Sequence, residues 1–184
     1  QYATPAFEAA KYGYQLSFIE AWSAAIAYTF QIYFDFSGYS DMAIGLARMF
    51  GIKLPINFNS PYKSTSIIEF WRRWHMTLSA FLRNYLYVPL GGNRKGSLRK
   101  YINILIVMFL GGLWHGAGWT YIMWGILHGF YLLLNHFYRY LKNYFQLKEK
   151  KPTLIYRIFC FFLTFLCVIV AWVIFRSETM DAAE

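Results

Sequence analysis

Four long apolar runs constrain this chain of 184 residues more than any other feature. They cover residues 16–34, 101–114, 119–138 and 154–175. A stretch of about 20 apolar residues is long enough to cross the hydrocarbon core of a bilayer as a helix. Helices and closed barrels are the structures that satisfy every backbone hydrogen bond inside that core. The pattern predicts an all-α polytopic membrane protein, folded as a bundle of transmembrane helices.

Composition and charge agree with a membrane protein. Hydrophobic residues make up 58% of the chain and charged residues 15%, against roughly 45–50% and about 25% in soluble domains. The net charge of +9 is also typical of nucleic-acid binding, but half of the basic residues cluster between apolar runs, in 93–100 and 139–151. The positive-inside rule places these two loops in the cytoplasm. The bilayer is therefore an expected partner, and nucleic acid is not.

The region between the first two runs has several predicted features. Gly38 and its serine neighbours predict a helix break, with Asp41 capping a shorter helix after it. Residues 53–65 contain two prolines and several turn-forming residues, which predicts a structured loop. Apolar residues then recur at three- and four-residue steps over residues 66–90. This spacing predicts one amphipathic helix that lies in the membrane interface or packs within the protein, ending at Pro89.

His115 is the ionisable residue on which two features coincide. The run 101–114 corresponds to about 21 Å of helix at 1.5 Å per residue, so it is too short to cross a hydrocarbon core about 30 Å thick. Glycines on both sides of His115 permit a helix break, and irregular backbone at this depth is tolerated where it lines a cavity. The sequence therefore predicts a cavity at His115. An imidazole there fits a general base that removes a hydroxyl proton, and it also fits an ion or proton pathway or simple packing.

The remaining histidines have less specific patterns. His75 lies at the edge of the apolar stripe, where a site residue and a buried, hydrogen-bonded histidine fit equally. His128 lies inside an apolar run, which makes it a functional candidate, although a packed histidine fits as well. His136 fits a residue at the membrane interface. Arg72 can hold a phosphate- or carboxylate-bearing donor or anchor the chain at the interface, and no zinc-ligand spacing occurs, so no metal is expected.

Three motifs resemble those of the membrane-bound O-acyltransferase family. They are FDFSGYSDMAIGLARMFG at 34–51, NFNSPYKSTSIIEFWRRWHMTLSAFLRNYLYVPLGGNRKG at 57–96 and GGLWHGAGWTYIMWGILHG at 111–129. The resemblance covers residues 28–176 and is closest to the bacterial branch that includes alginate O-acetylation and teichoic acid D-alanylation. It implies a ring of transmembrane helices, with interfacial and re-entrant helices, around a central funnel. We expect residues 1–184 to form a single domain of this family that lacks its N-terminal helices and its C-terminal end.

The resemblance also implies an activity. We expect an O-acyltransferase that crosses the bacterial cytoplasmic (inner) membrane several times and uses His115 as general base and His75 as second active-site histidine. It would move an acyl group, with acetyl as first choice, from a cytoplasmic thioester to a hydroxyl of an exopolysaccharide or a periplasmic relay protein. The expected co-substrate is acetyl-CoA or an acyl carrier, with no bound cofactor, and the expected partner is a periplasmic acetyltransferase- or esterase-like protein. The candidate substrate-binding residues are Trp71, Arg72, Trp114 and Asn57.

Other functions remain open at this point. D-alanyl transfer to teichoic acid-type polymers uses the same kind of chemistry. A transporter or export channel would use His115 in a proton or substrate path instead. A non-catalytic scaffold would need neither His115 nor His75.

Overall fold

The computed structural model of the chain describes residues 3–146, 152–177 and 179, and every regular element within them is helical. This confirms the predicted all-α class. The four long helices are α2 (Phe18–Met49), α5 (Gly96–His115), α6 (Trp119–Tyr144) and α7 (Leu154–Arg176). The short elements are α1 (Ala3–Lys11), the 3-10 turn η1 (Pro61–Lys63), α3 (Ile67–Trp71), α4 (Met76–Leu82) and the π-helical turn η2 (Arg83–Tyr87).

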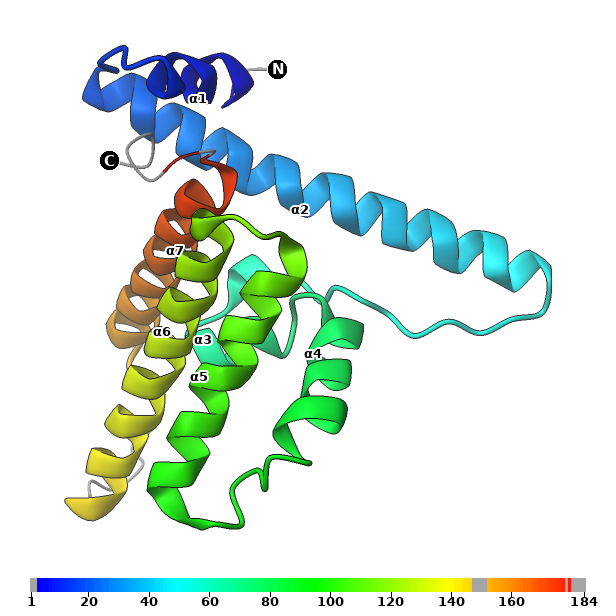
Figure 1. Cartoon of the computed structure of the whole chain (residues 1–184), viewed down its shortest axis with the longest axis vertical. Helices are drawn as coiled ribbons and strands as arrows, with labels where there is room; N and C mark the ends of the chain where they lie inside the picture. The colour runs from blue at the N-terminus through cyan, green and yellow to red at the C-terminus, as the bar shows by residue number, and fades with distance from the viewer. Residues whose placement is uncertain (1–2, 147–151, 178, 180–184) are drawn as a thin grey trace.

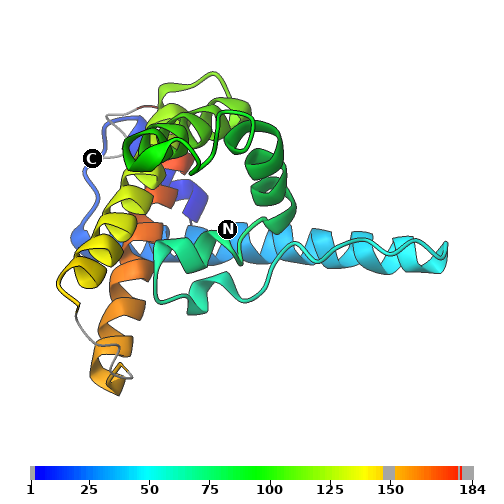
Figure 2. The same ribbon diagram turned by 90° about the horizontal axis from the view of Figure 1, so that it is seen from below.

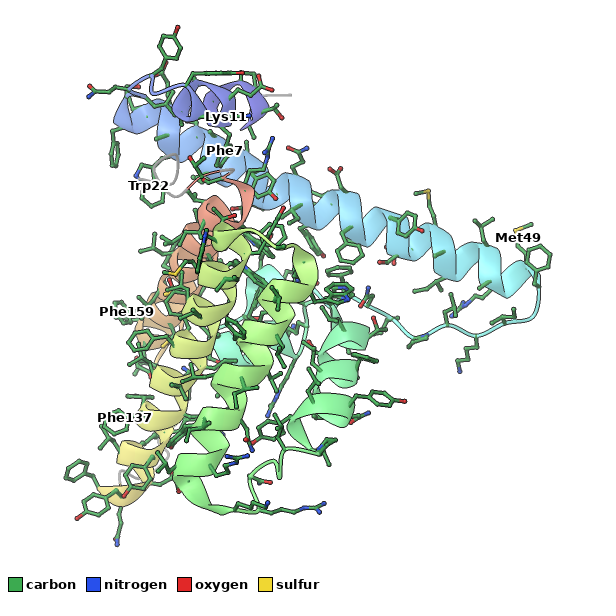
Figure 3. The ribbon with its side chains drawn as sticks, viewed as in Figure 1. Phe7, Lys11, Trp22, Met49, Phe137 and Phe159 are labelled. Atoms are coloured by element: carbon green, nitrogen blue, oxygen red, sulfur yellow. The ribbon has the colours of Figure 1, made fainter. Side chains whose placement is uncertain are left out.

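The helices α5, α6 and α7 lie side by side and alternate in direction (Figure 1). Viewed from below, α3 to α7 are arranged around a centre, and α2 crosses one end of this group (Figure 2). The C-terminal half of α2 extends well beyond the other helices, and the chain returns from its tip before α3 begins. Large apolar side chains cover the outer surface, and Phe137 of α6 and Phe159 of α7 point away from the bundle (Figure 3).

Two glycines bring the backbones of α5 and α6 into contact. A Cβ atom on Gly112 would collide with the carbonyl oxygen of Tyr121 and lie 3.3 Å from the Cα atom of Gly125. A Cβ atom on Gly125 would collide with the carbonyl oxygen of Met108 and lie 3.2 Å from the Cα atom of Gly112. Small residues at a helix interface allow this close approach. The close packing fixes the position of the α5 C-terminus, where His115 lies.

An aromatic core joins α3, α6 and α7. It consists of Ile67, Phe70, Trp74, Trp124, Val168, Ala171 and Trp172. The loop before α3 is tied to this core by Tyr62, whose hydroxyl donates to the carbonyl oxygen of Thr29 at 2.6 Å and accepts from the Trp172 indole at 3.1 Å. The predicted structured loop at 53–65 is thus confirmed, since it contains η1 and is anchored to both α2 and α7.

The predicted helix break at Gly38 is wrong, and Asp41 caps no helix, because α2 continues through both residues. One glycine costs about 1 kcal/mol relative to alanine within a helix, which is too little by itself to end a helix of 32 residues. A capping box fixes the start of α2 instead. The hydroxyl of Ser17 accepts from the backbone N–H of Glu20, while the Glu20 carboxylate accepts from the backbone N–H of Ser17.

The single amphipathic helix predicted over 66–90 is also wrong. The chain leaves the helix after Trp71, and His75 adopts the left-handed conformation with φ of +43° before α4 begins. The preceding loop supplies backbone partners for this break. The N–H of Asn59 donates to the Arg73 carbonyl at 2.9 Å, and the N–H of Met76 donates to the Asn57 carbonyl at 3.0 Å. These contacts are long-range, so the apolar periodicity did not reveal them.

The helix that contains the run 101–114 is longer than the run itself. Helix α5 has 20 residues because it already begins at Gly96, which gives about 30 Å of helix. Arg and Lys are good helix formers whose long side chains reach water from an apolar helix end. Both α5 and α7 are long and apolar enough to cross a membrane. The break after His115 is confirmed, because α6 begins at Trp119.

The two basic loops differ from their predicted bounds. The segment 93–100 is a loop only up to the start of α5, and α6 extends through Arg139 to Tyr144. The last part of 139–151, residues 147–151, lies outside the described residues.

Candidate active site

His75 is held at the break between α3 and α4 by Asn57. Its ring nitrogen Nδ1 lies 3.2 Å from the Asn57 side-chain oxygen. That oxygen also accepts from the Thr77 hydroxyl at 3.0 Å and from the Thr77 N–H at 3.3 Å. Because an amide oxygen accepts hydrogen bonds, Nδ1 of His75 carries the proton and Nε2 keeps its lone pair. Phe36 packs edge-on against the ring, with the centroids 4.7 Å apart.

The electrostatics link His75 to His115. Burial lowers the pKa of His75 to about 4, and the charge of a protonated His115 is the second cause. His75 is therefore neutral at pH 7. His115 therefore lies close enough for its charge to act on His75, although one residue belongs to the break after α3 and the other to the end of α5.

His115 is half-buried among aromatic rings. Its ring meets those of Trp114, Trp124 and Phe175 edge to face, at centroid distances of 4.9, 5.2 and 5.1 Å. Trp114 is itself 64% exposed, so His115 lies between a buried aromatic wall and an open side. This arrangement limits hydration of the imidazole on its buried side.

Trp71 and His128 connect α3 to α6 behind this wall. The Trp71 indole N–H donates to Nδ1 of His128 at 3.3 Å, so neutral His128 carries its proton on Nε2. His128 is fully buried, and its ring packs on those of Trp71 and Trp124. Within the described residues, Nε2 of His128 and the indole nitrogen of Trp124 have no hydrogen-bond partner. The geometry agrees with the interpretation of His128 as a packed, hydrogen-bonded histidine.

Comparison with protein families identifies the chain. The family model described as the membrane-bound O-acyltransferase family matches residues 5–175. The chain belongs to this family. The match includes His75, His115 and the whole aromatic core.

Several named proteins are similar in sequence to this membrane-bound O-acyltransferase chain. A Helicobacter pylori protein named peptidoglycan O-acetyltransferase is 52% identical over 168 residues, which are 91% of this chain and 31% of the relative. A probable alginate O-acetylase of Azotobacter vinelandii is 52% identical over 164 residues, or 89% of this chain and 31% of the relative. A teichoic acid D-alanyltransferase of Bacillus subtilis is 34% identical over 136 residues, which are 70% of this chain and 34% of the relative. The chain thus spans about a third of the length of these curated relatives.

The structure brings most of the candidate residues of this acyltransferase chain together. Asn57 contacts His75 directly, and Trp114 packs on His115. Trp71 reaches His115 through Trp124, whose ring lies 5.8 Å from that of Trp71 and 5.2 Å from that of His115. Arg72 differs from the others. Its exposed side chain acts electrostatically on His136.

Two residues in contact with His115 were missed by the sequence analysis. Trp124 lies four residues before His128 and therefore shares its face of α6, so the helical spacing could have revealed it. Phe175 lies in a continuous apolar run, where nothing in the sequence separates it from its neighbours. In the part of the chain that the structure describes, no three potential metal ligands are grouped.

Proposed function

We propose that this chain carries the catalytic centre of a membrane O-acyltransferase, which moves an acetyl group from a cytoplasmic thioester, acetyl-CoA or an acyl carrier, to a hydroxyl. The observation that carries the proposal is that two half-buried histidines from separate elements, His75 and His115, lie close enough for the charge of His115 to lower the pKa of His75. The names of the two relatives that are 52% identical support acetyl as the group transferred. The proposed acceptor is a polysaccharide or a periplasmic relay protein that acts with this one.

In the proposed mechanism, neutral His115 takes the proton of the acceptor hydroxyl while its oxygen attacks the thioester carbonyl carbon. The C–O bond forms, the C–S bond breaks, and the leaving thiolate receives the proton from His115. His75 presents Nε2 to a reactant because Asn57 holds its other nitrogen. The aromatic rings around His115 keep competing water away.

The proposed topology places several of the long helices across the bacterial inner membrane. The length and apolar character of α5 and α7 support it, as does the apolar outer surface (Figure 3). The excess of Lys and Arg in 93–100 and 139–151 supports a cytoplasmic location for these segments. The family match over residues 5–175 supports a single domain.

A reconstituted system tests the proposal. The natural protein in proteoliposomes is expected to form acetyl esters on a hydroxyl-bearing polysaccharide inside the vesicles when radiolabelled acetyl-CoA, or an acetylated carrier protein, is added outside. D-alanyl thioesters serve as a parallel donor, because the Bacillus subtilis relative is named for D-alanyl transfer. Passage of unmodified polymer across the vesicle without any acyl donor would contradict the proposal and support a transporter.

Asn57→Ala is expected to lower kcat about 10- to 100-fold with little change in KM. The substitution removes the hydrogen-bond acceptor that orients His75, and a misplacement of about 1 Å at a reacting group costs up to about 100-fold in rate. Steady-state kinetics of acetyl transfer measure the effect. Asn59→Ala is the matched control, because the structure uses the backbone of Asn59 at the same break. An equal loss of kcat in both variants would mean that the loop, and not the orientation of His75, determines the rate.

A further inference from the structure

A cluster of positive charge surrounds His136, away from the two central histidines. The Lys100 ammonium lies 3.3 Å from Nδ1 of His136. Since an ammonium group only donates hydrogen bonds, His136 accepts here and is neutral. The charges of Lys100, Arg139 and Arg72 all act on this ring. The cluster therefore combines α5, α6 and the end of α3, toward the end of the bundle where α5 begins (Figure 1).

Within the described residues, no carboxylate neutralises the positive charges in this cluster. Among residues 3–146, 152–177 and 179, none of Arg72, Lys100 and Arg139 forms an ion pair, and the nearby carboxylate of Glu69 is bound by Arg73 at 2.8 Å. Arg72 and Arg139 are exposed, and Lys100 is partly exposed. Three cations held around one neutral histidine repel one another unless an anion lies between them. The cluster is therefore accessible to an anion and favours one with more than one negative charge.

An open cavity, lined mostly by apolar side chains together with Arg83, lies one helical turn from the cluster. Its volume is about 160 Å³. Its lining includes Ile104, four residues after Lys100, and Leu132, four residues before His136. Trp71, adjacent to Arg72, forms another part of the wall and donates its hydrogen bond to His128. The cavity thus adjoins Trp71, whose ring packs against that of Trp124 in the candidate active site.

We propose that Arg72, Lys100 and Arg139 form a binding site for the phosphate groups of a ligand whose uncharged part enters the adjoining cavity. Arginine and lysine on three elements offer the donors that phosphate oxygens accept. Two sources share this chemistry, the phosphates of the thioester donor and the headgroup of an anionic phospholipid. The first source rests on the proposed acyltransferase function.

The spacing fits a thioester donor that carries phosphate at the far end of an extended arm. His136 lies twelve positions after Trp124 on α6, which corresponds to about 18 Å along the helix, and Trp124 contacts His115. A pantetheine arm of about 13 bonds is roughly 15 Å long when extended, because three consecutive bonds span about 3.3–3.6 Å. A donor with its phosphates in the cluster would therefore bring its thioester close to the level of His115.

Binding of inorganic pyrophosphate to the natural protein, purified in phosphate-free maltoside micelles, tests the site without any turnover. Lys100→Gln combined with Arg139→Gln is expected to weaken binding about tenfold or more, because the double variant removes two charged hydrogen-bond donors to the phosphate oxygens. Arg99→Gln is the matched control, since Arg99 is the exposed neighbour of Lys100 on α5, and it should change the affinity less than twofold. Arg72→Gln alone, at an exposed position, repeats the test without altering the packing of α5 and α6. Equal affinities in all variants, or an equal loss in Arg99→Gln, would overturn the proposal.

Two further measurements separate the sources. If the donor supplies the phosphates, the double variant raises the KM for acetyl-CoA about tenfold and leaves the KM for acetylpantetheine unchanged. If a lipid supplies them, phosphatidylglycerol added to the micelles displaces pyrophosphate from the wild-type protein, and neither KM changes in the double variant. The protein could also bind pyrophosphate through the cluster and yet transfer no acyl group. That result would support the phosphate site and contradict the proposed function.

Discussion

Gly125→Ala is expected to destabilise the protein by about 2 kcal/mol, because its new methyl group would occupy the space of the Met108 carbonyl oxygen on α5. Overpacking of this kind costs up to about 3 kcal/mol, and it exceeds the roughly 1 kcal/mol that alanine gains over glycine in a helix. The backbone cannot rotate away as a side chain would, so the two helices must separate. Thermal or denaturant unfolding of the purified protein in detergent measures the change.

Gly111→Ala provides the control for this prediction. Gly111 lies next to Gly112 on α5, and its added Cβ atom would meet one methyl group of Leu82 at 3.5 Å, an ordinary contact. The variant should be as stable as the wild-type protein or slightly more stable. If Gly111→Ala and Gly125→Ala have the same stability, the backbones of α5 and α6 are not in the close contact described.

His115→Ala is expected to lower kcat for acetyl transfer about 100- to 10,000-fold, the usual contribution of a general base. The imidazole has edge-to-face contacts with three rings, so its removal should leave the fold and the KM for the donor nearly unchanged. The acetyl-transfer rate of the His115→Ala protein, measured at increasing concentrations of free imidazole, is a second readout. Free imidazole should restore part of the rate, since His115 lies beside the exposed Trp114.

Two controls distinguish a loss of chemistry from a loss of structure in this variant. The His115→Ala protein should unfold at nearly the same temperature as the wild type and bind pyrophosphate equally well. A full rate in His115→Ala would remove this residue from the reaction, and a lost rate without imidazole rescue in an unstable protein would indicate a structural role.

The local features of the fold could be predicted from the sequence. Apolar runs identified the four long helices, because burial of apolar residues along a helix leaves a pattern in the sequence itself. The glycines after His115 identified the break between α5 and α6, which the structure confirms. The predicted break at Gly38 failed because one glycine costs too little free energy to end a long helix.

The features that depend on distant contacts could not be predicted. The left-handed conformation of His75 is accompanied by two backbone hydrogen bonds, one accepted by Asn57 from Met76 and one donated by Asn59 to Arg73. The periodicity of residues 66–90 does not contain this information. The ring of Phe175 reaches His115 only through the packing of α7. The cluster of Arg72, Lys100 and Arg139 joins three segments that are far apart in the sequence. In each case the missing information is which elements lie side by side.

Direct transfer through His115 is the central claim, and a rapid-quench measurement with radiolabelled acetyl-CoA tests it most directly. The acetyl label should pass to the acceptor hydroxyl in one phase, no label should remain on the protein, and the His115→Ala protein should bind the donor without transferring the label. Label that first appears on the protein and then moves to the acceptor, or transfer at the wild-type rate by His115→Ala, would contradict the claim.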